Sequence, residues 1–299
     1  MDNKTNKMQK NILLKDLTTF KIGGVAKYYC QASSQEEIIE AVKWVQEKGA
    51  PFFVLGGGSN VLIGDKKYKG LVIQIKNQIL KIKNTDQNSK IIEVGAGVPL
   101  GKLVGVALQE GLTGMEWAMG IPGTAGGAVY GNTGAFGQSM GDIVEEVEAI
   151  DISNIKYQIS NIKKEGCKFG YRDSIFKRSK NLIILSVKIK LQNGEKAEIE
   201  NKMKEFFQKK KQTQPLEFFS AGSIFKNGEN YKAADLIEKV GLKGKRIGGV
   251  EVSQKHSNFI VNNGRGKARD VKKLIDLIKK QVKKKFNMEL QEEIQYLGF

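Results

Sequence analysis

The 299-residue chain contains one histidine, two cysteines and four prolines, and these scarcities exclude several classes of protein. Cys30 and Cys167 are too few for a disulfide framework and lack the spacing of metal ligands, which favours a reducing, cytoplasmic compartment. The sequence has neither the G-x-S-x-G motif of serine hydrolases nor the H-E-x-x-H motif of zinc proteases. His256 stands alone in a polar segment, and we expect it to be structural rather than catalytic.

Long apolar runs are also lacking. No stretch approaches the roughly 20 apolar residues that a membrane helix requires. The N-terminal segment MDNKTNKMQKNILLKDL is polar and rich in lysine, unlike a secretion signal. We therefore expect no membrane association.

Arginine is scarce although the chain is strongly basic, with a formal net charge of +17. The 49 basic residues include only five arginines, at positions 172, 178, 246, 265 and 269. Arginine is the residue favoured for bidentate contacts to phosphates and base edges, so its scarcity argues against a nucleic-acid-binding protein. The lysine excess is typical of compositional drift in an A/T-rich genome, and it also suits anionic small ligands.

Glycine, in contrast, is abundant, and it is concentrated in two places. In PFFVLGGGSNVLIGD (51–65) an apolar run leads into three consecutive glycines. Such a turn either presents backbone N–H groups to a phosphate or is only a tight structural turn. It matches neither the Rossmann G-x-G-x-x-G pattern nor a Walker A loop. The residues of this segment leave both interpretations open.

The second concentration, GMEWAMGIPGTAGGAVYGNTGAFG (114–137), is rich in glycine and alanine. A loop of such small residues fills little space with its own side chains, so it is suited to lie against a large planar ligand. The alternative is a flexible linker, but Trp117, Ile121, Val129 and Tyr130 are apolar anchors that a linker does not need.

Apolar periodicity and capping signals predict an α/β alternation in the first third and shorter strands over 140–195. Helices are expected from the capping box at Ser34–Glu37 to Gly49, and over 203–215, 233–241 and 268–286. The lysines of the last helix are expected to face solvent. Strands are expected over 52–55, 61–63, 71–75, around 250 and 260, and near the C-terminus.

Five motifs in this order resemble UDP-N-acetylenolpyruvoylglucosamine reductases, the MurB flavoenzymes of peptidoglycan synthesis, in their compact form. These motifs are LGGGSNVLIGD (55–65), GIPGTAGGAVYGNTGAFG (120–137), FGYRDSIFK (169–177), AGSIFKN (221–227) and KHSNFIVN (255–262). The resemblance implies an α+β protein with a vanillyl-alcohol-oxidase-type (PCMH-like) FAD-binding fold. It also implies two FAD-binding subdomains, 1–80 and 81–200, and a substrate-binding domain, 201–299.

The same resemblance implies non-covalent FAD, with NADPH as co-substrate, in a cytoplasmic enzyme that we expect to be a monomer. The first glycine loop would wrap the FAD pyrophosphate and the second would lie along the flavin and its ribityl tail. The residues implied are Gly56, Gly57, Gly58, Ser59, Asn60, Gly120, Gly123, Thr124, Gly126, Gly127 and Ala128.

The family's reaction reduces UDP-N-acetylglucosamine enolpyruvate to UDP-N-acetylmuramate, and it implies three catalytic residues here. Arg172 would stabilise negative charge on the substrate, and Ser223 would donate a proton to C2. Glu293 fits the family's terminal glutamate better than Glu292 does. Gln295 stands where relatives often carry arginine, which makes Glu293 the least secure of the three.

Tyr171, Lys226 and Asn227 would contact the UDP-sugar. Several of these candidates also have a structural alternative. Taken singly, Arg172 suits a surface ion pair near Asp173, and Ser223 suits a helix or turn cap. Lys226 and Asn227 each suit a turn.

An FAD-dependent oxidase of the same fold, acting on an alcohol or a sugar lactone, is the alternative function. Many such oxidases bind flavin covalently through a histidine in the first FAD subdomain. The only histidine here is His256, far outside that subdomain, which argues for non-covalent FAD.

Overall fold

The computed structural model describes residues 8–153 and 156–299, and the polar N-terminal stretch 1–7 lies outside these ranges. The described chain forms two compact units. Unit 1 comprises residues 30–57 and 72–209, and unit 2 comprises residues 8–29, 58–71 and 210–299. The three-domain division expected from the sequence remains a prediction. None of the described helices combines the length and the apolar character that a membrane span needs.

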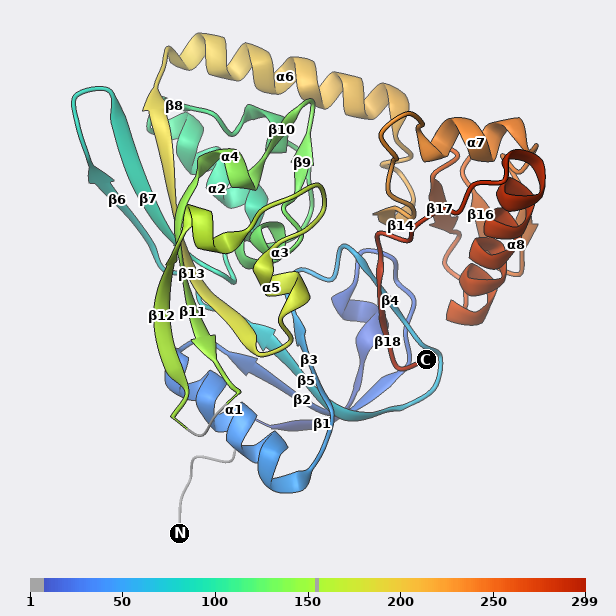
Figure 1. Cartoon of the computed structure of the whole chain (residues 1–299), viewed down its shortest axis with the longest axis horizontal. Coiled ribbons are helices and arrows are strands. Elements are labelled where there is room, and N and C mark those ends of the chain that lie inside the picture. The colour runs from blue at the N-terminus through green and yellow to red at the C-terminus, as the bar shows by residue number, and fades with distance from the viewer. Residues whose placement is uncertain (1–7, 154–155) are drawn as a thin grey trace. The chain divides into compact units, whose positions relative to one another are not determined.

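Unit 1 is built on a six-stranded antiparallel sheet with the order β12-β11-β13-β7-β6, and β8 pairs with β13 (Figure 1). Its longest strand, β13, is buried along most of its length and lies between β11 and β7. The strands are β6 (Leu80–Asn84), β7 (Ser89–Gly95), β8 (Leu112–Thr113), β11 (Val144–Asp151), β12 (Gln158–Lys163) and β13 (Leu182–Asn193).

The first helix confirms the predicted capping signals. The Ser34 side chain accepts a hydrogen bond from the Glu37 N–H, and Gly49 ends the helix with a left-handed backbone at φ 56°. The helices of unit 1 are α1 (Gln35–Lys48), α2 (Leu100–Gln109), α3 (Ala125–Tyr130), α4 (Met140–Ile143) and α5 (Ile175–Arg178), with short 3-10 helices η3 (Glu116–Ala118) and η4 (Lys164–Cys167).

The second glycine-rich segment is more regular than the loop that its composition predicts. It contains η3 and α3, and its end forms the hairpin β9 (Gly134–Ala135) and β10 (Gln138–Ser139). The short helix α3 packs against β13 and β7. This places the small residues of the segment directly on the central sheet of unit 1.

Three elements continue from one unit into the other. They are β2 (Val25–Ala32), β5 (Tyr68–Ile75) and α6 (Lys196–Thr213). Strands β2 and β5 belong to a four-stranded sheet of order β1-β2-β5-β3, with β1 (Gln9–Leu13) and β3 (Phe52–Leu55) at its edges. Helix α6 begins at Lys196, before the predicted start at 203.

Unit 2 contains an antiparallel sheet of order β14-β17-β16-β15, and the C-terminal strand β18 pairs in parallel with β4. The apolar stripe of α8 packs into the core of this unit, as the helical periodicity predicts. The elements are η2 (Leu14–Leu17), β4 (Val61–Ile63), β14 (Phe219–Ser223), α7 (Ala233–Lys239), β15 (Arg246–Ile247), β16 (Val250–Val252), β17 (Phe259–Asn262), α8 (Ala268–Phe286) and β18 (Gln295–Leu297).

We expect Ile278→Ala to lower the free energy of unfolding by about 2–5 kcal/mol, because Ile278 is fully buried in the unit 2 core. Its control is Lys280→Ala on the exposed face of α8, which should stay within about 0.5 kcal/mol of the wild type. Urea unfolding measures both. Equal effects of the two substitutions would contradict the assigned core face of α8.

Candidate active site

The first glycine loop, residues 56–60, follows β3, and its three glycines lie close against other parts of the chain. A Cβ on Gly57 would stand 2.6 Å from the Cα of Gly123, and a Cβ on Gly56 would stand 2.9 Å from Oγ1 of Thr124. The two glycine-rich segments of unit 1 therefore meet backbone to backbone. In unit 2, Gly58 adopts φ 64°, and a Cβ there would overlap the carbonyl oxygen of Leu17.

At this meeting point the backbone carbonyls have protein donors. The carbonyl of Gly56 accepts a hydrogen bond from Nε2 of Gln74 at 3.3 Å, and the carbonyl of Gly123 accepts one from the N–H of Leu100 at 3.0 Å. Within the described residues, the N–H groups of Gly57 and Gly123 donate to no protein acceptor. N–H groups without a protein acceptor, beside glycines that leave room for a ligand, fit the diphosphate of a dinucleotide cofactor. We call Gly56, Gly57 and Gly123 the glycine cradle.

Thr124 fixes the second glycine segment at the start of α3. Its Oγ1 accepts from the N–H of Gly127 at 3.3 Å, and it forms a β-bridge with Pro99. Gly126 allows α3 to approach β7, because a Cβ there would lie 2.6 Å from the Cβ of Ala96.

The other predicted residues of this segment differ in exposure. Ala128 is buried, whereas Gly127 and Gly120 are exposed. A Cβ on Gly120, which has φ 74°, would stand 3.0 Å from the ring of Phe207.

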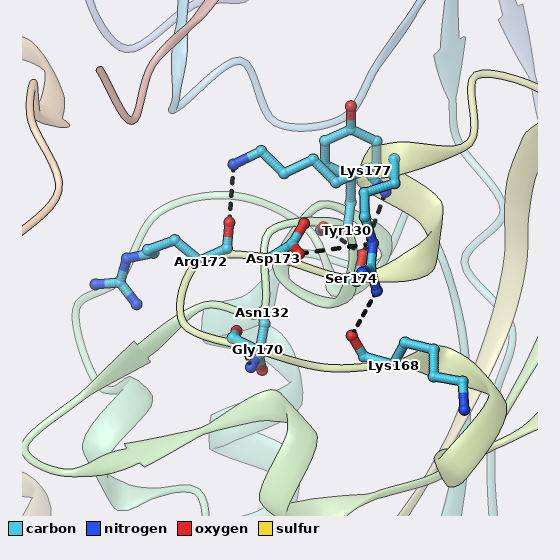
Figure 2. A network of polar contacts seen from close by, with 9 residues as sticks. Tyr130, Asn132, Lys168, Gly170, Arg172, Asp173, Ser174 and Lys177 are labelled. Carbon is cyan, nitrogen blue, oxygen red and sulfur yellow. Dashed lines mark hydrogen bonds and ion pairs between the residues drawn. The ribbon is translucent and has the colours of Figure 1, made fainter. Parts of the chain in front are cut away.

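Arg172 lies in a tight turn of unit 1 and takes a left-handed backbone with φ 56°. Its Nη2 donates to the carbonyl of Gly134 at 3.0 Å, and its own carbonyl accepts from Nζ of Lys177 at 2.9 Å. The guanidinium also stands 5.4 Å from the ring centroid of Tyr171. Figure 2 shows the Arg172 side chain extending away from Asp173, whose ion-pair partner is instead Arg178 at 3.6 Å.

Two buried polar residues that the sequence analysis missed hold this turn (Figure 2). Asn132 donates through Nδ2 to the carbonyl of Gly170 at 2.8 Å, and its Oδ1 accepts from the N–H of Gly141 at 2.8 Å. Ser174 donates to the carbonyl of Tyr130 at 2.7 Å. Because both side chains are buried and hydrogen-bonded, the position of Arg172 is fixed by long-range contacts.

Ser223 lies in unit 2 at the end of β14, where a buried asparagine holds the residues that follow it. Asn258 accepts through Oδ1 from the N–H of Phe225 at 2.9 Å and donates through Nδ2 to the Phe225 carbonyl at 2.8 Å. Its own carbonyl accepts from the N–H of Ile224 at 2.8 Å. Asn258 was also missed, since its role depends on a partner 33 residues away.

Glu293 and Asn60 are brought to the same part of unit 2 as Ser223. The N–H of Glu293 donates to the carbonyl of Ile224 at 2.8 Å, one residue beyond Ser223. Asn60 donates through Nδ2 to the Glu293 carbonyl at 3.3 Å, and its own carbonyl accepts from the N–H of Gln295 at 3.0 Å. The carboxylate of Glu292, in contrast, pairs with Lys279 of α8 at 2.8 Å.

The remaining candidates, Lys226, Asn227 and Ser59, also lie in unit 2. The N–H of Lys226 donates to the carbonyl of Gln291, and the side-chain oxygen of Asn227 accepts from the N–H of Ala233 at the start of α7. Asn227 thus has a local structural role. Ser59, in the first glycine loop, is half-buried.

His256 is half-buried in unit 2, and burial lowers the pKa of its imidazole below the ordinary value. Its Nδ1 accepts a hydrogen bond from the N–H of Asn258 at 3.3 Å. This contact fits the structural role expected for the lone histidine.

Two family models match separate regions of the chain. Residues 26–154 match the family model "FAD binding domain", and residues 214–297 match "UDP-N-acetylenolpyruvoylglucosamine reductase, C-terminal domain". The chain is 42% identical to the UDP-N-acetylenolpyruvoylglucosamine reductase of Caldanaerobacter subterraneus subsp. tengcongensis, over 99% of this chain and 95% of the relative. The chain belongs to this reductase family.

Further relatives agree with that assignment. The reductase of Prochlorococcus marinus is 41% identical over 98% of this chain and 99% of the relative. The crystal structure of the MurB reductase from Thermus caldophilus matches with a TM-score of 0.82 and 34% identity, covering 97% of this chain and 100% of that chain.

Family membership confirms the α+β class and the vanillyl-alcohol-oxidase-type FAD-binding fold with its C-terminal domain. The protein is an FAD-dependent oxidoreductase of peptidoglycan precursor synthesis. The glycine cradle of unit 1 fits that cofactor. His256 lies outside the FAD-binding match at residues 26–154.

We expect Gly57→Ala to purify with at least about tenfold less flavin per protein, because a Cβ would collide with the Gly123 backbone and displace the N–H groups of the cradle. The flavin-to-protein absorbance ratio measures this. The control is Gly105→Ala in α2, where a Cβ meets nothing within 4 Å. If both variants retain flavin equally, the cradle has been misplaced.

Proposed function

We propose that this protein reduces UDP-N-acetylglucosamine enolpyruvate to UDP-N-acetylmuramate with NADPH as the reductant, as a cytoplasmic monomer. The main support is family membership over nearly the whole chain, joined to the hydrogen bonds that bring Glu293 beside the Ser223 strand. When bound, FAD would supply the hydride-transfer chemistry that links NADPH, through the flavin N5 position, to C3 of the enolpyruvyl ether.

Arg172 supplies the positive charge in this proposal. Hydride arrival at C3 leaves negative charge at C2 and on the adjacent carboxylate, and a fixed cation near that carboxylate lowers the barrier. The guanidinium remains charged at any physiological pH. Its contact to Gly134 and the Lys177 contact to its carbonyl hold the group in place, so little reorganisation is needed during the reaction.

Ser223 supplies the proton to C2. A serine hydroxyl is a very weak acid, so this transfer depends on the strong basicity of the charged substrate carbon and on a hydrogen-bonded relay. We assign Glu293 to that relay. The hydrogen bond between the Glu293 N–H and the Ile224 carbonyl keeps the glutamate in register with the end of β14.

Three further residues contact the UDP-sugar in this proposal. Tyr171 is 55% exposed, and its ring stands 5.4 Å from the Arg172 guanidinium, so an aromatic surface lies beside the proposed cation. Lys226 carries a charge suited to a diphosphate, and Asn227 follows it directly.

An anaerobic absorbance trace of the holoenzyme tests the function. NADPH should bleach the flavin band, and UDP-N-acetylglucosamine enolpyruvate, added next, should restore it. Bleaching without return would overturn the substrate assignment. Return on an alcohol or a sugar lactone would likewise contradict it, and so would absence of the flavin band in folded protein supplied with FAD.

We expect Arg172→Lys to slow the return of the flavin band at least about 100-fold, because lysine cannot reproduce the planar, anchored guanidinium. Bleaching by NADPH should change less than about twofold on the same grounds. The matched control is Arg178→Lys in α5, whose exposed side chain pairs with Asp173. Unchanged return in Arg172→Lys would remove the proposed role of Arg172.

A further inference from the structure

A compact charge cluster ties the C-terminal segment to helix α8 within unit 2. The Glu292 carboxylate accepts from Nζ of Lys279 at 2.8 Å and from the hydroxyl of Tyr296, and it lies 3.7 Å from Nζ of Lys272. The Lys272 ammonium also stands 5.4 Å from the ring centroid of Tyr296. The proposed hydride and proton transfers use none of these contacts.

The cluster is better shielded than an ordinary surface ion pair. The Glu292 side chain is only 15% exposed. Burial raises the pKa of its carboxyl, but hydrogen bonds from Lys279 and Tyr296 and the charge of Lys272 outweigh burial and hold the pKa below its usual range. Burial and the bond to Glu292 raise the pKa of the Tyr296 hydroxyl. Glu292 is therefore a charged acceptor and Tyr296 a neutral donor at neutral pH.

The backbone of Glu292 is coupled directly to the proposed proton-transfer residues. Glu292 forms an isolated β-bridge with Phe225, two residues after Ser223. On either side of this bridge, the N–H of Lys226 donates to the Gln291 carbonyl and the N–H of Glu293 donates to the Ile224 carbonyl, each at 2.8 Å. A shift of residue 292 therefore moves the backbone of Glu293 and strains the end of β14.

From this coupling we propose that Glu292 is a positioning residue: its bonds to Lys279 and Tyr296 hold Glu293 and Ser223 in register for protonation of the substrate. The inference rests on the proposed function and concerns residues that the family resemblance did not assign.

Within the described residues, the other contacts of residues 290–294 do not attach Glu292 itself to α8. Leu290 and Ile294 are buried in the unit 2 core and fix the segment at two points. Glu292 lies midway between them, in a single bridge rather than a continuous strand. Its anchored side chain is thus the contact that holds this middle portion to α8.

The test separates the two half-reactions in holoenzyme variants. We expect Glu292→Ala to slow the return of the flavin band about tenfold when the enolpyruvyl substrate is added, because small displacements of catalytic groups cost large factors in rate. Bleaching by NADPH and the KM for the substrate should change less than about twofold on the same reasoning.

Two further variants distinguish the effect of the Glu292 hydrogen bonds from the effect of its charge and from a loss of folded protein. Glu292→Gln keeps an oxygen for Lys279 and an amide for the Tyr296 hydroxyl, so its return rate should recover to within about threefold of the wild type. Tyr296→Phe removes one anchor and should slow the return about threefold. If Glu292→Ala does not fold, Tyr296→Phe decides the matter.

Glu289→Ala is the control, because the Lys283–Glu289 pair joins the same two segments at the surface. Its return rate should equal that of the wild type. The inference is overturned if Glu292→Ala or Tyr296→Phe behaves like this control, or if bleaching and return fall equally. Failure of the wild-type flavin band to return would instead count against the proposed function.

Discussion

The close approach of two glycine-rich segments, at Gly57 and Gly123 of unit 1, is the constraint on which the proposed cofactor site depends. Gly57 and Gly123 are in backbone contact that no other residue permits. Gln74 and Leu100 bind the carbonyls of this region, and the N–H groups of both glycines remain available among the described residues. These N–H groups are the donors that we propose for the diphosphate.

Buried asparagines play a corresponding part for the proposed catalytic residues. Asn132 fixes the turn that carries Arg172 in unit 1, and Asn258 fixes the residues after Ser223 in unit 2. Each asparagine satisfies both a donor and an acceptor of the backbone. An unpaired buried amide would be costly, so these side chains restrict the turns to one conformation. The proposed catalytic side chains, Arg172 and Ser223, are thus held by backbone that the asparagines fix.

Elements with strong local signals were predicted from the sequence. Capping residues and apolar periodicity identified α1 and α8, and five motifs in the family's order identified the family by resemblance. Elements without such signals were missed. Strand β1 is mostly exposed and has no apolar alternation, and α3 consists of small residues whose helical form depends on the Thr124 cap and on packing against the sheet.

The candidate site shows the same limit. Its glycines could be found because a dense run of glycine is visible in the sequence alone. Asn132, Asn258 and Glu292 could not, since each acts on a segment distant along the chain. The preference for Glu293 over Glu292 came from spacing, and the structure adds that the Glu292 carboxylate is bound to α8. The roles of the site residues remain predictions.

Titration of flavin-free protein with FAD and with riboflavin tests the glycine cradle most directly. If the backbone N–H groups hold the diphosphate, FAD should bind at least about 100-fold more tightly than riboflavin, a difference of about 2.7 kcal/mol. FMN, with a single phosphate, should fall between them. Equal affinities for FAD and riboflavin would contradict the assignment of the glycine loops to the diphosphate.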